Sequence, residues 1–379
     1  MIKCQFHIQF LSKIKIKEYG TTHMRCVQPS QYLKACGIFS QVSCIYRSIP
    51  RSKNAIFFHR ANLDSHTRQY LRYIKSKGLI TIYDTDDLLF DKGGIKHFSK
   101  PDSIQAYQSM MKACDVVLVS TRYLQNKASA FHNDVRVMKN GLSFDLLDKA
   151  SNFHSHQKNK NNIYITISYL SGSKHHDHDF EIVAPVLYKI LQDFPNVRLL
   201  LMGKLQYPAK FTKFGERFTY KEFVPYKDFW RVFEEIDINI VPLDISDPFA
   251  QARSEIKYME AGLFGIPTIA SPTQTYREAI DHNVNGLLAQ DGEWYESLKT
   301  LVTDKQKREQ IGEAARKDVL ANYSPEVRMT EWDHLLKDIV HQYGNKKKAN
   351  RFQVGVDYAG VVLFWLWRRL KIAKRNMSF

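Results

Sequence analysis

The chain has 379 residues, 44% of them hydrophobic, enough for two domains of ordinary size with full cores. Its formal net charge is +16, and half of that excess lies after Gly344, where nine lysines and arginines accompany a single aspartate. This placement argues against nucleic-acid binding by the folded body.

The first residues, MIKCQFHIQFLSKIKIK, do not form a signal-peptide pattern. His7 and Gln9 interrupt the apolar run, and no small-residue cleavage site follows. No stretch of the sequence reaches the roughly 20 apolar residues that a membrane-spanning helix needs. The five cysteines have an odd count and no C-x-x-C spacing. They favour unpaired thiols in a reducing compartment, so we expect a cytoplasmic protein.

Residues 1–150 predict an α/β domain with a parallel sheet. Strands and helices alternate along this part of the chain, and such alternation is typical of parallel sheets. The predicted strands cover residues 4–11, 55–58, 79–83, 115–120 and 135–138, and the predicted helices cover residues 30–35, 63–76 and 103–113.

A polar segment, residues 151–162, predicts a linker because its HSHQKNKNN composition has nothing to bury. Residues 163–343 then repeat the alternation and predict a second Rossmann-like domain. Two such domains facing across a cleft would place their ligands outside the carboxyl ends of the strands. The predicted strands cover residues 163–169, 197–202, 236–241, 268–270 and 285–288, and the predicted helices cover residues 179–193, 277–280, 294–303 and 304–322.

The most informative stretch is DPFAQARSEIKYMEAGLFGIPTIASPT, residues 247–273. We expect Ser254 to cap a short helix that turns its apolar face to a sheet. Arg253, Ser254 and Lys257 would lie in its first turn, beside backbone N–H groups that make an anion site. Glu260, farther along the helix, could accept hydrogen bonds from a ribose diol. Cations for a diphosphate and a carboxylate for a sugar ring predict a bound nucleotide diphosphate.

The string RSEIKYMEAGLFGIPTIAS resembles the nucleotide-binding motif of GT-B glycosyltransferases. The resemblance is to the retaining family 4 type, in particular its branch with a K-S-x-[IL]-K-x-x-E-A pattern. It implies that Glu260 binds the nucleotide ribose and that Arg253, Ser254 and Lys257 face the diphosphate. Many members carry a second glutamate eight residues before the first, where this chain has Ala252. The donor-sugar contact is therefore missing or supplied elsewhere; the simpler alternative is that Lys257 and Glu260 are only an exposed helix pair.

The loop SGSKHHDHD, residues 171–179, follows the first strand of the second domain. Gly172 allows the backbone to approach a phosphate closely there. The loop is similar to the S-G-[ST]-x-x-H-x-x-D-F pattern of the same branch. Two alternatives are a metal site formed by its histidines and aspartates, and a solvated loop whose Asp179 only caps the next helix. The candidate donor-binding residues of this loop are Gly172, Ser173, Lys174 and His178, of which Lys174 could add a positive charge for a phosphate.

Asp84-Thr85-Asp86 spells the D-x-D that binds Mn²⁺ or Mg²⁺ in GT-A glycosyltransferases. A GT-A enzyme has its nucleotide-binding fold near the N-terminus, whereas the motif here lies near residue 260. A GT-B enzyme needs no metal, because helix dipoles and cationic side chains stabilise the leaving diphosphate. We therefore expect no metal and no cofactor beyond the nucleotide sugar itself, which is the donor substrate.

The segment YDTDDLLF, residues 83–90, resembles the loop that follows a first-domain strand in the same branch. Asp86 falls about where other members place a histidine against the donor sugar, so Asp86 and Asp87 are the candidate catalytic residues. Alternatively, Asp84 and Asp87 only satisfy backbone amides in a turn. Arg25 and Arg60 are candidate acceptor or phosphate contacts, or surface arginines paired with carboxylates.

Residues 344–379 form a basic, aromatic tail that includes VGVDYAGVVLFWLWRRLKI, residues 354–372. Its apolar part is too short to cross a membrane. Phe364, Trp365 and Trp367, next to the basic pair at 368–369, suit a lipid interface, and the basic flanks would attract anionic headgroups. The alternative is a C-terminal helix that packs back on the body.

Together these features predict a GT-B glycosyltransferase of the hexosyltransferase type that moves a sugar from a nucleotide diphosphate donor to a hydroxyl acceptor with retention. The tail predicts a glycan or lipid-linked acceptor in cell-surface polysaccharide assembly, at the inner face of the cell membrane. A catalytically silent GT-B subunit that binds a glycan or a partner is the first alternative, because of Ala252. A metal-dependent D-x-D transferase and a basic nucleic-acid-binding protein are the others.

Overall fold

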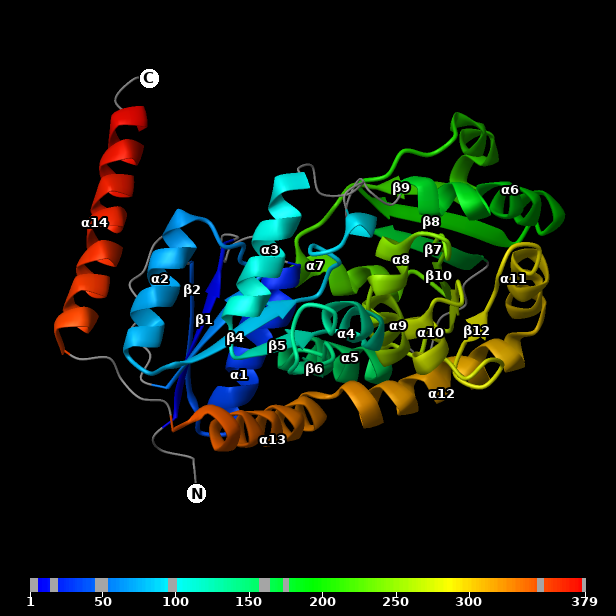
Figure 1. Cartoon of the computed structure of the whole chain (residues 1–379). Coiled ribbons are helices and arrows are strands. Elements are labelled where there is room, and N and C mark those ends of the chain that lie inside the picture. Colours follow the sequence, from blue (N-terminus) through cyan, green and yellow to red (C-terminus); the bar gives the residue numbers. More distant parts are fainter. Residues whose placement is uncertain are drawn as a thin grey trace. The chain divides into compact units, whose positions relative to one another are not determined.

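The computed structural model describes residues 6–13, 20–44, 54–94, 101–156, 164–172, 177–345 and 351–376. The chain divides into two compact units, drawn in Figure 1. Unit 1 comprises Met1–Lys139 and Arg328–Phe379, and unit 2 comprises Asn140–Val327. Unit 2 is thus an insertion, in sequence, within unit 1.

Unit 1 is built on a six-stranded parallel sheet with strand order β2-β1-β3-β4-β5-β6. All five residues of β3 are buried, as expected for a parallel strand covered on both faces by helices. The strands are β1 (His7–Ser12), β2 (Phe39–Cys44), β3 (Ala55–His59), β4 (Ile80–Thr85), β5 (Val116–Val119) and β6 (Val135–Val137). The helices are the π-helical turn η1 (His23–Val27), α1 (Gln28–Ala35), α2 (Ser65–Ser76), the 3₁₀ turn η2 (Lys92–Gly94), α3 (Pro101–Ala113), α4 (Arg122–Ala128), α13 (Pro325–Tyr343) and α14 (Arg351–Asn376).

Unit 2 has a second six-stranded parallel sheet, with strand order β12-β11-β10-β7-β8-β9. One core of buried aliphatic and aromatic side chains includes Ile167, Leu199 and Ile240 from its central strands. The strands are β7 (Ile165–Ser171), β8 (Val197–Gly203), β9 (Phe218–Lys221), β10 (Ile238–Val241), β11 (Thr268–Ala270) and β12 (Leu287–Leu288). The helices are α5 (Phe144–His156), α6 (Asp177–Asp193), η5 (Ala209–Arg217), α7 (Tyr226–Phe229), η6 (Trp230–Glu234), α8 (Pro248–Ala252), α9 (Ile256–Leu263), α10 (Gln274–Ala279), α11 (Trp294–Thr303) and α12 (Lys305–Tyr323).

The predicted two-domain α/β architecture is confirmed, although the units begin and end elsewhere than the predicted domains. The first half of the predicted linker is helical, since α5 reaches His156; residues 157–163 lie outside the described part of the chain. At the C-terminal end of the predicted second domain, α13 joins unit 1 through Trp332. This side chain is 1% exposed, and its ring centroid lies 6.1 Å from those of Phe10 and Phe57. A large buried aromatic side chain thus decides which unit the helix joins.

Several elements were not predicted, among them two strands and two helices of particular interest. The strands β2 and β9 lie at the edges of their sheets, where residues are only partly buried and the apolar pattern is weak. The helices α4 and α13 follow Thr121 and Ser324, residue types that cap helices. The tail is helical, and α14 lies beside α2 in unit 1 (Figure 1).

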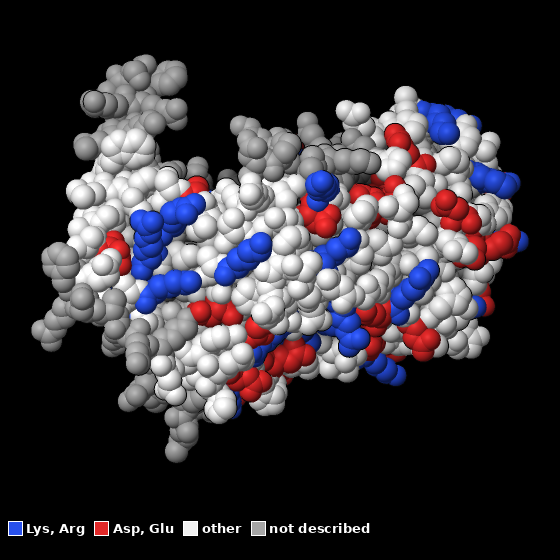
Figure 2. Space-filling model, in the orientation of Figure 1, with Lys and Arg blue, Asp and Glu red and all other residues white. Residues whose placement is uncertain are grey.

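Charged side chains on the face drawn in Figure 2 are mixed in sign. Lysines and arginines are interspersed there with aspartates and glutamates. Such mixing is typical of an ordinary solvated surface rather than of a broad basic footprint for nucleic acid.

The glycines of residues 262–265 let α9 lie close against α12. A Cβ on Gly262 would meet Val319 Cγ2 at 2.9 Å, and a Cβ on Gly312 would meet the Gly265 carbonyl oxygen at 2.0 Å. The second clash is with backbone, which cannot turn away as a flexible side chain can. Both glycines are therefore part of the support that holds α9 in place.

We expect Gly312→Ala to lower the free energy of unfolding by about 1–3 kcal/mol, because α12 must move away from the Gly265 carbonyl. The urea midpoint of unfolding measures this loss. Gly360→Ala is the matched control, since a Cβ there meets no atom within 4 Å in helix α14 and alanine favours a helix over glycine. Equal midpoints for the two variants would contradict the close packing.

Candidate functional site

Each sheet has one point where the strand order reverses, and the candidate residues gather at its carboxyl edge. In unit 2 the chain runs from β7 outward through β8 to β9, and then returns to the other side of β7 as β10. Crevices outside the carboxyl ends at such a reversal are where open α/β sheets bind ligands. The segment 171–179 follows β7, and the stretch 247–260 follows β10, so the topology brings both predicted motifs to one edge.

Lys257, in the first turn of α9, has an ammonium group inside unit 2. Its Nζ is buried and has no hydrogen-bond partner among the described residues. It lies 4.7 Å from the centroid of the Tyr169 ring on β7. Burial, followed by the positive charge of Arg253, lowers the pKa of Lys257 to about 8, against the opposing effects of Asp179 and Glu260. A buried ammonium without an acceptor is costly, so this position favours an anionic ligand.

Arg253, between α8 and α9, is held by an aspartate from the first turn of α6. Its Nη1 donates to Oδ2 of Asp179 at 2.5 Å, and both side chains are largely buried. Oδ1 of Asp179 accepts from the backbone N–H of Asp244 at 3.3 Å. The expected cap role of Asp179 is wrong, because α6 begins at Asp177 and Asp179 lies within it, facing Arg253. The pair fixes the guanidinium at the carboxyl edge of the sheet.

The other predicted donor-binding residues differ in burial. Glu260 is 6% exposed and lies one turn along α9 from Lys257. Ser254 does not cap α9, whose N-cap is Glu255; its Oγ accepts from Asn140 Nδ2 at 2.9 Å. Glu255 is itself used internally, as its Oε1 accepts from the Tyr323 hydroxyl at 2.9 Å.

The loop after β7 is only partly described. Gly172 is exposed, and a Cβ there would meet nothing within 4 Å. The side chain of His178 is 72% exposed and its Nε2 lies 3.4 Å from Oδ2 of Asp244. Ser173 and Lys174 lie outside the described residues, so their predicted contacts with the donor stay predictions.

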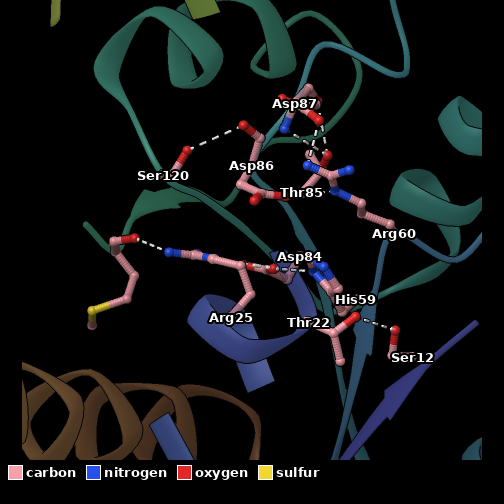
Figure 3. Close-up of polar contacts among 11 residues, drawn as sticks. Ser12, Thr22, Arg25, His59, Arg60, Asp84, Thr85, Asp86, Asp87 and Ser120 are labelled. Atoms are coloured by element: carbon pink, nitrogen blue, oxygen red, sulfur yellow. Dashed lines mark hydrogen bonds and ion pairs between the residues drawn. The ribbon is translucent and has the colours of Figure 1, made fainter. Parts of the chain in front are cut away.

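A buried ion-pair cluster occupies the carboxyl edge of the unit 1 sheet, with Asp84 at its centre (Figure 3). Arg25 donates to Oδ1 of Asp84 from Nη2 at 2.5 Å and to the Met138 carbonyl oxygen from Nη1 at 2.6 Å. His59 donates from Nδ1 to Oδ2 of Asp84 at 2.8 Å. The cluster joins η1 to the carboxyl ends of β3, β4 and β6. Arg25 is 1% exposed, which favours a structural role over the predicted contact with an acceptor.

Arg60 forms a second cluster with the two candidate catalytic carboxylates. Its Nε donates to Oδ1 of Asp86 at 2.6 Å, and its Nη2 donates to Oδ2 of Asp87. Burial raises the pKa of Asp86, but the charges of Arg60 and His59 outweigh it and hold that pKa below its usual value. Asp86 is therefore a carboxylate at neutral pH.

The backbone of Arg60 has a left-handed φ of 48°. This conformation costs a residue with a Cβ about 1–3 kcal/mol and is most common at functional sites. The backbone N–H of Arg60 donates to the Asp84 carbonyl oxygen at 2.8 Å, which holds the turn. The strained turn aims the Arg60 side chain at Asp86 and Asp87, beside the point where the strand order reverses between β1 and β3.

The D-x-D carboxylates are thus neutralised by side-chain cations. Asp84 is paired with Arg25, and Asp86 and Asp87 are paired with Arg60. Within the described residues, no group of three or more His, Cys, Asp and Glu side chains is arranged to hold a metal ion. The role of His59 was not predicted from the sequence, although this residue directly follows the predicted strand 55–58.

The fold and parts of the sequence are similar to known glycosyltransferases. Residues 148–318 match the model of the family described as glycosyl transferases group 1. Sucrose-phosphate synthase from Thermosynechococcus elongatus has a TM-score of 0.65 at 12% identity, over 89% of this chain and 100% of that one. HepE of Anabaena, in complex with UDP and glucose, has a TM-score of 0.62 at 15% identity, over 88% of this chain and 100% of that one.

The chain has the GT-B fold. WaaG, a glycosyltransferase involved in lipopolysaccharide biosynthesis, shares it with a TM-score of 0.58 at 11% identity, over 86% of this chain and 99% of that one. A search of curated protein sequences found no match. The family match covers most of unit 2, including Arg253, Lys257 and Glu260. The predicted GT-B fold is confirmed by the structural neighbours.

We expect Asp84→Asn to lower the free energy of unfolding by about 3–5 kcal/mol, because it leaves the guanidinium of Arg25 buried without its carboxylate. The thermal midpoint and the urea midpoint both measure this loss. Asp145→Asn is the control, since Asp145 is 68% exposed in its pair with Lys149 and its loss should cost about 1 kcal/mol or less. Unchanged stability of Asp84→Asn would show that the cluster does not hold the sheet edge.

Proposed function

We propose that this GT-B protein is a retaining glycosyltransferase that moves a sugar from a nucleotide diphosphate donor to an acceptor hydroxyl. Retention follows from the family 4 resemblance of residues 253–271, and so does the assignment of the ribose to Glu260. The acceptor we propose is a glycan or a lipid-linked glycan of cell-surface polysaccharide assembly, because the tail is basic and aromatic.

The buried ammonium of Lys257 is the observation that carries this proposal. It lacks a hydrogen-bond partner among the described residues at the edge where open α/β sheets bind ligands. A diphosphate would supply acceptor oxygens to Nζ and to the N–H groups at the start of α9. Glu260, one turn along, would then accept from the ribose hydroxyls. Arg253 adds positive charge next to Lys257, as the pKa of Lys257 shows.

Catalysis would come mainly from stabilising the departing diphosphate. Negative charge develops on the leaving oxygen as the bond to the sugar breaks, and fixed cations at that position lower the barrier. Arg253 is fixed by Asp179, so little reorganisation is needed. We assign Asp86, with Asp87 beside it, to the reacting sugar or the acceptor hydroxyl, because both side chains lie at the end of β4, where Arg60 pairs with them and lowers the pKa of Asp86.

A catalytically silent GT-B subunit is the second candidate, and Ala252 favours it. Ala252 is 1% exposed at the end of α8 and brings no carboxylate to a donor sugar. Such a subunit would bind the nucleotide sugar or a glycan without transferring it. Binding and turnover must therefore be measured separately.

We expect the affinity for a nucleoside diphosphate to be constant below pH 8 and to fall above it, because Lys257 loses its proton with a pKa of about 8. Lys257→Met should bind roughly 10- to 100-fold more weakly at pH 7, the loss of one charge-assisted hydrogen bond. Isothermal titration between pH 7 and pH 9.5 measures both effects.

Lys257→Arg is the matched control for this titration, because a guanidinium stays charged throughout the range. It should bind the nucleotide with no fall in affinity above pH 8. If the affinity of Lys257→Arg fell above pH 8 as in the wild type, another group would cause the pH dependence. Lys257 would then not contact the diphosphate.

We expect UDP, GDP, dTDP or ADP to raise the thermal midpoint, with one base clearly preferred, and UDP is the first to test because HepE binds it. At a ligand concentration 100 times the dissociation constant, the free energy of unfolding rises by about 2.7 kcal/mol. Glu260→Ala should lose most of this gain because the ribose loses its carboxylate. Glu278→Ala, on a solvated face of α10, is the matched control and should keep it.

The same nucleotide as a sugar donor then separates the two candidates. Hydrolysis or transfer by the purified protein supports the enzyme, and an α- or β-anomer identical to the donor's supports retention. Binding without any turnover favours the silent subunit. The absence of a response to all four nucleotides would contradict the enzyme and would leave only a subunit that binds a glycan.

A further inference from the structure

Helix α14 packs on unit 1 by one face only. It lies along α2 (Figure 1), where the ring centroids of Phe364 and His66 are 4.5 Å apart and those of Tyr358 and Tyr73 are 5.4 Å apart. Val361, between these contacts, is fully buried. Aromatic contacts and a buried aliphatic side chain fix which face of α14 points inward.

The opposite face of α14 is apolar and exposed. Residues spaced by three and four along a helix share a face, and those turned away from Val361 are all apolar. Five of the nine large hydrophobic side chains that are exposed among the described residues belong to this one helix, so the concentration is specific to it. A contiguous exposed apolar surface marks an interaction site. The outer face of α14, as we name it, comprises Val356 (50% exposed), Ala359, Leu363 (66%), Leu366 (45%) and Trp367 (54%).

The positive charge of residues 368–375, at the C-terminal end of α14, favours an anionic binding partner. Residues 368–375 contain five lysines and arginines and no acidic residue, and Asp357 is the sole acidic residue after Gly344. A second copy of this chain would bring the same positive charge against it and be repelled. A nucleic acid offers negative charge but no apolar surface for Leu363 and Leu366. A bilayer surface with anionic headgroups offers both.

The length of the apolar face sets how the helix would meet a bilayer. No helix in the described part of the chain is long and apolar enough to cross a membrane. One apolar face on a charged helix suits a helix that lies in the interface plane, with that face buried about 5–10 Å deep. Trp367, at the basic end of the outer face, has the amphipathic ring that the headgroup region favours.

We propose that the outer face of α14 binds the surface of an anionic lipid bilayer, with the helix parallel to the membrane and its basic end at the headgroups. Val356, Leu363, Leu366 and Trp367 enter the acyl boundary, while Val361 and Phe364 keep α14 attached to α2. Unit 1 is thereby held at the membrane. This contact does not depend on the transfer reaction, and it would bring the protein to an acceptor that is itself lipid-linked.

Flotation of the full-length protein with vesicles tests the proposal. We expect it to float with vesicles of phosphatidylcholine containing 30% phosphatidylglycerol and to bind pure phosphatidylcholine at least tenfold more weakly. The Leu363→Ser/Leu366→Ser variant should lose at least tenfold in partitioning to the anionic vesicles, since both leucines leave the acyl boundary. Its thermal midpoint should match the wild type because both side chains are exposed.

The matched control is Phe39→Ser/Phe223→Ser, which removes two exposed aromatic side chains elsewhere and should bind the vesicles like the wild type. Failure of the wild type to bind, or equal binding by the leucine variant, would overturn the proposal. A wild-type dimer that the leucine variant dissociates, without vesicle binding, would assign the outer face to a second copy instead. Nucleotide binding is expected to be unchanged in the leucine variant, so the two proposals fail independently.

Discussion

A buried charge must meet an opposite charge, and this constraint shapes the carboxyl edges of both sheets. In unit 1 the constraint is met internally, since Asp84 receives Arg25 and His59. In unit 2 it is met for Arg253 by Asp179, whereas Nζ of Lys257 has no hydrogen-bond partner among the described residues. A bound anion would offset the energy of burying that ammonium. The carboxyl edge of the sheet thus holds a paired cluster in unit 1, and in unit 2 an ammonium that we propose pairs with the donor.

The position of Lys257 depends on how α9 is supported. Gly262 and Gly312 let α9 and α12 approach until backbone meets backbone, so the helix cannot shift without breaking contact. Tyr258, in α9, donates to Asp318 of α12 at 2.7 Å and adds a polar tie. Glycine and alanine at positions 261–265 of the motif are therefore packing residues, while Lys257 and Glu260 are the residues that we propose for donor binding. The α9 motif can serve both packing and the proposed donor binding, because side chains on opposite faces of a helix meet different neighbours.

Unit 1 combines a strained backbone turn at Arg60 with a helix, α14, that has one packed face and one exposed face. The left-handed backbone of Arg60 places its guanidinium on Asp86 and Asp87. The buried cluster around Asp84 supports this strained turn, because the Asp84 carbonyl oxygen accepts from the backbone N–H of Arg60. Far from this edge, α14 uses aromatic contacts with α2 on one side and presents aliphatic side chains on the other. The two proposals thus rest on separate features, Lys257 and the residues near it in unit 2 and the outer face of α14 in unit 1.

The sequence alone determined the alternating α/β architecture, the motif at 253–260 and the helix bounds of 294–303, because periodicity and capping are local. It did not predict β2 and β9, whose edge positions need little apolar patterning, or the assignment of α13 to unit 1, which rests on Trp332 meeting Phe10 and Phe57. Only the tertiary structure paired Arg25 with Asp84, Arg60 with Asp86 and Arg253 with Asp179, across 59, 26 and 74 residues of chain. Pairings over such separations depend on strand order and register, which residue spacing does not encode.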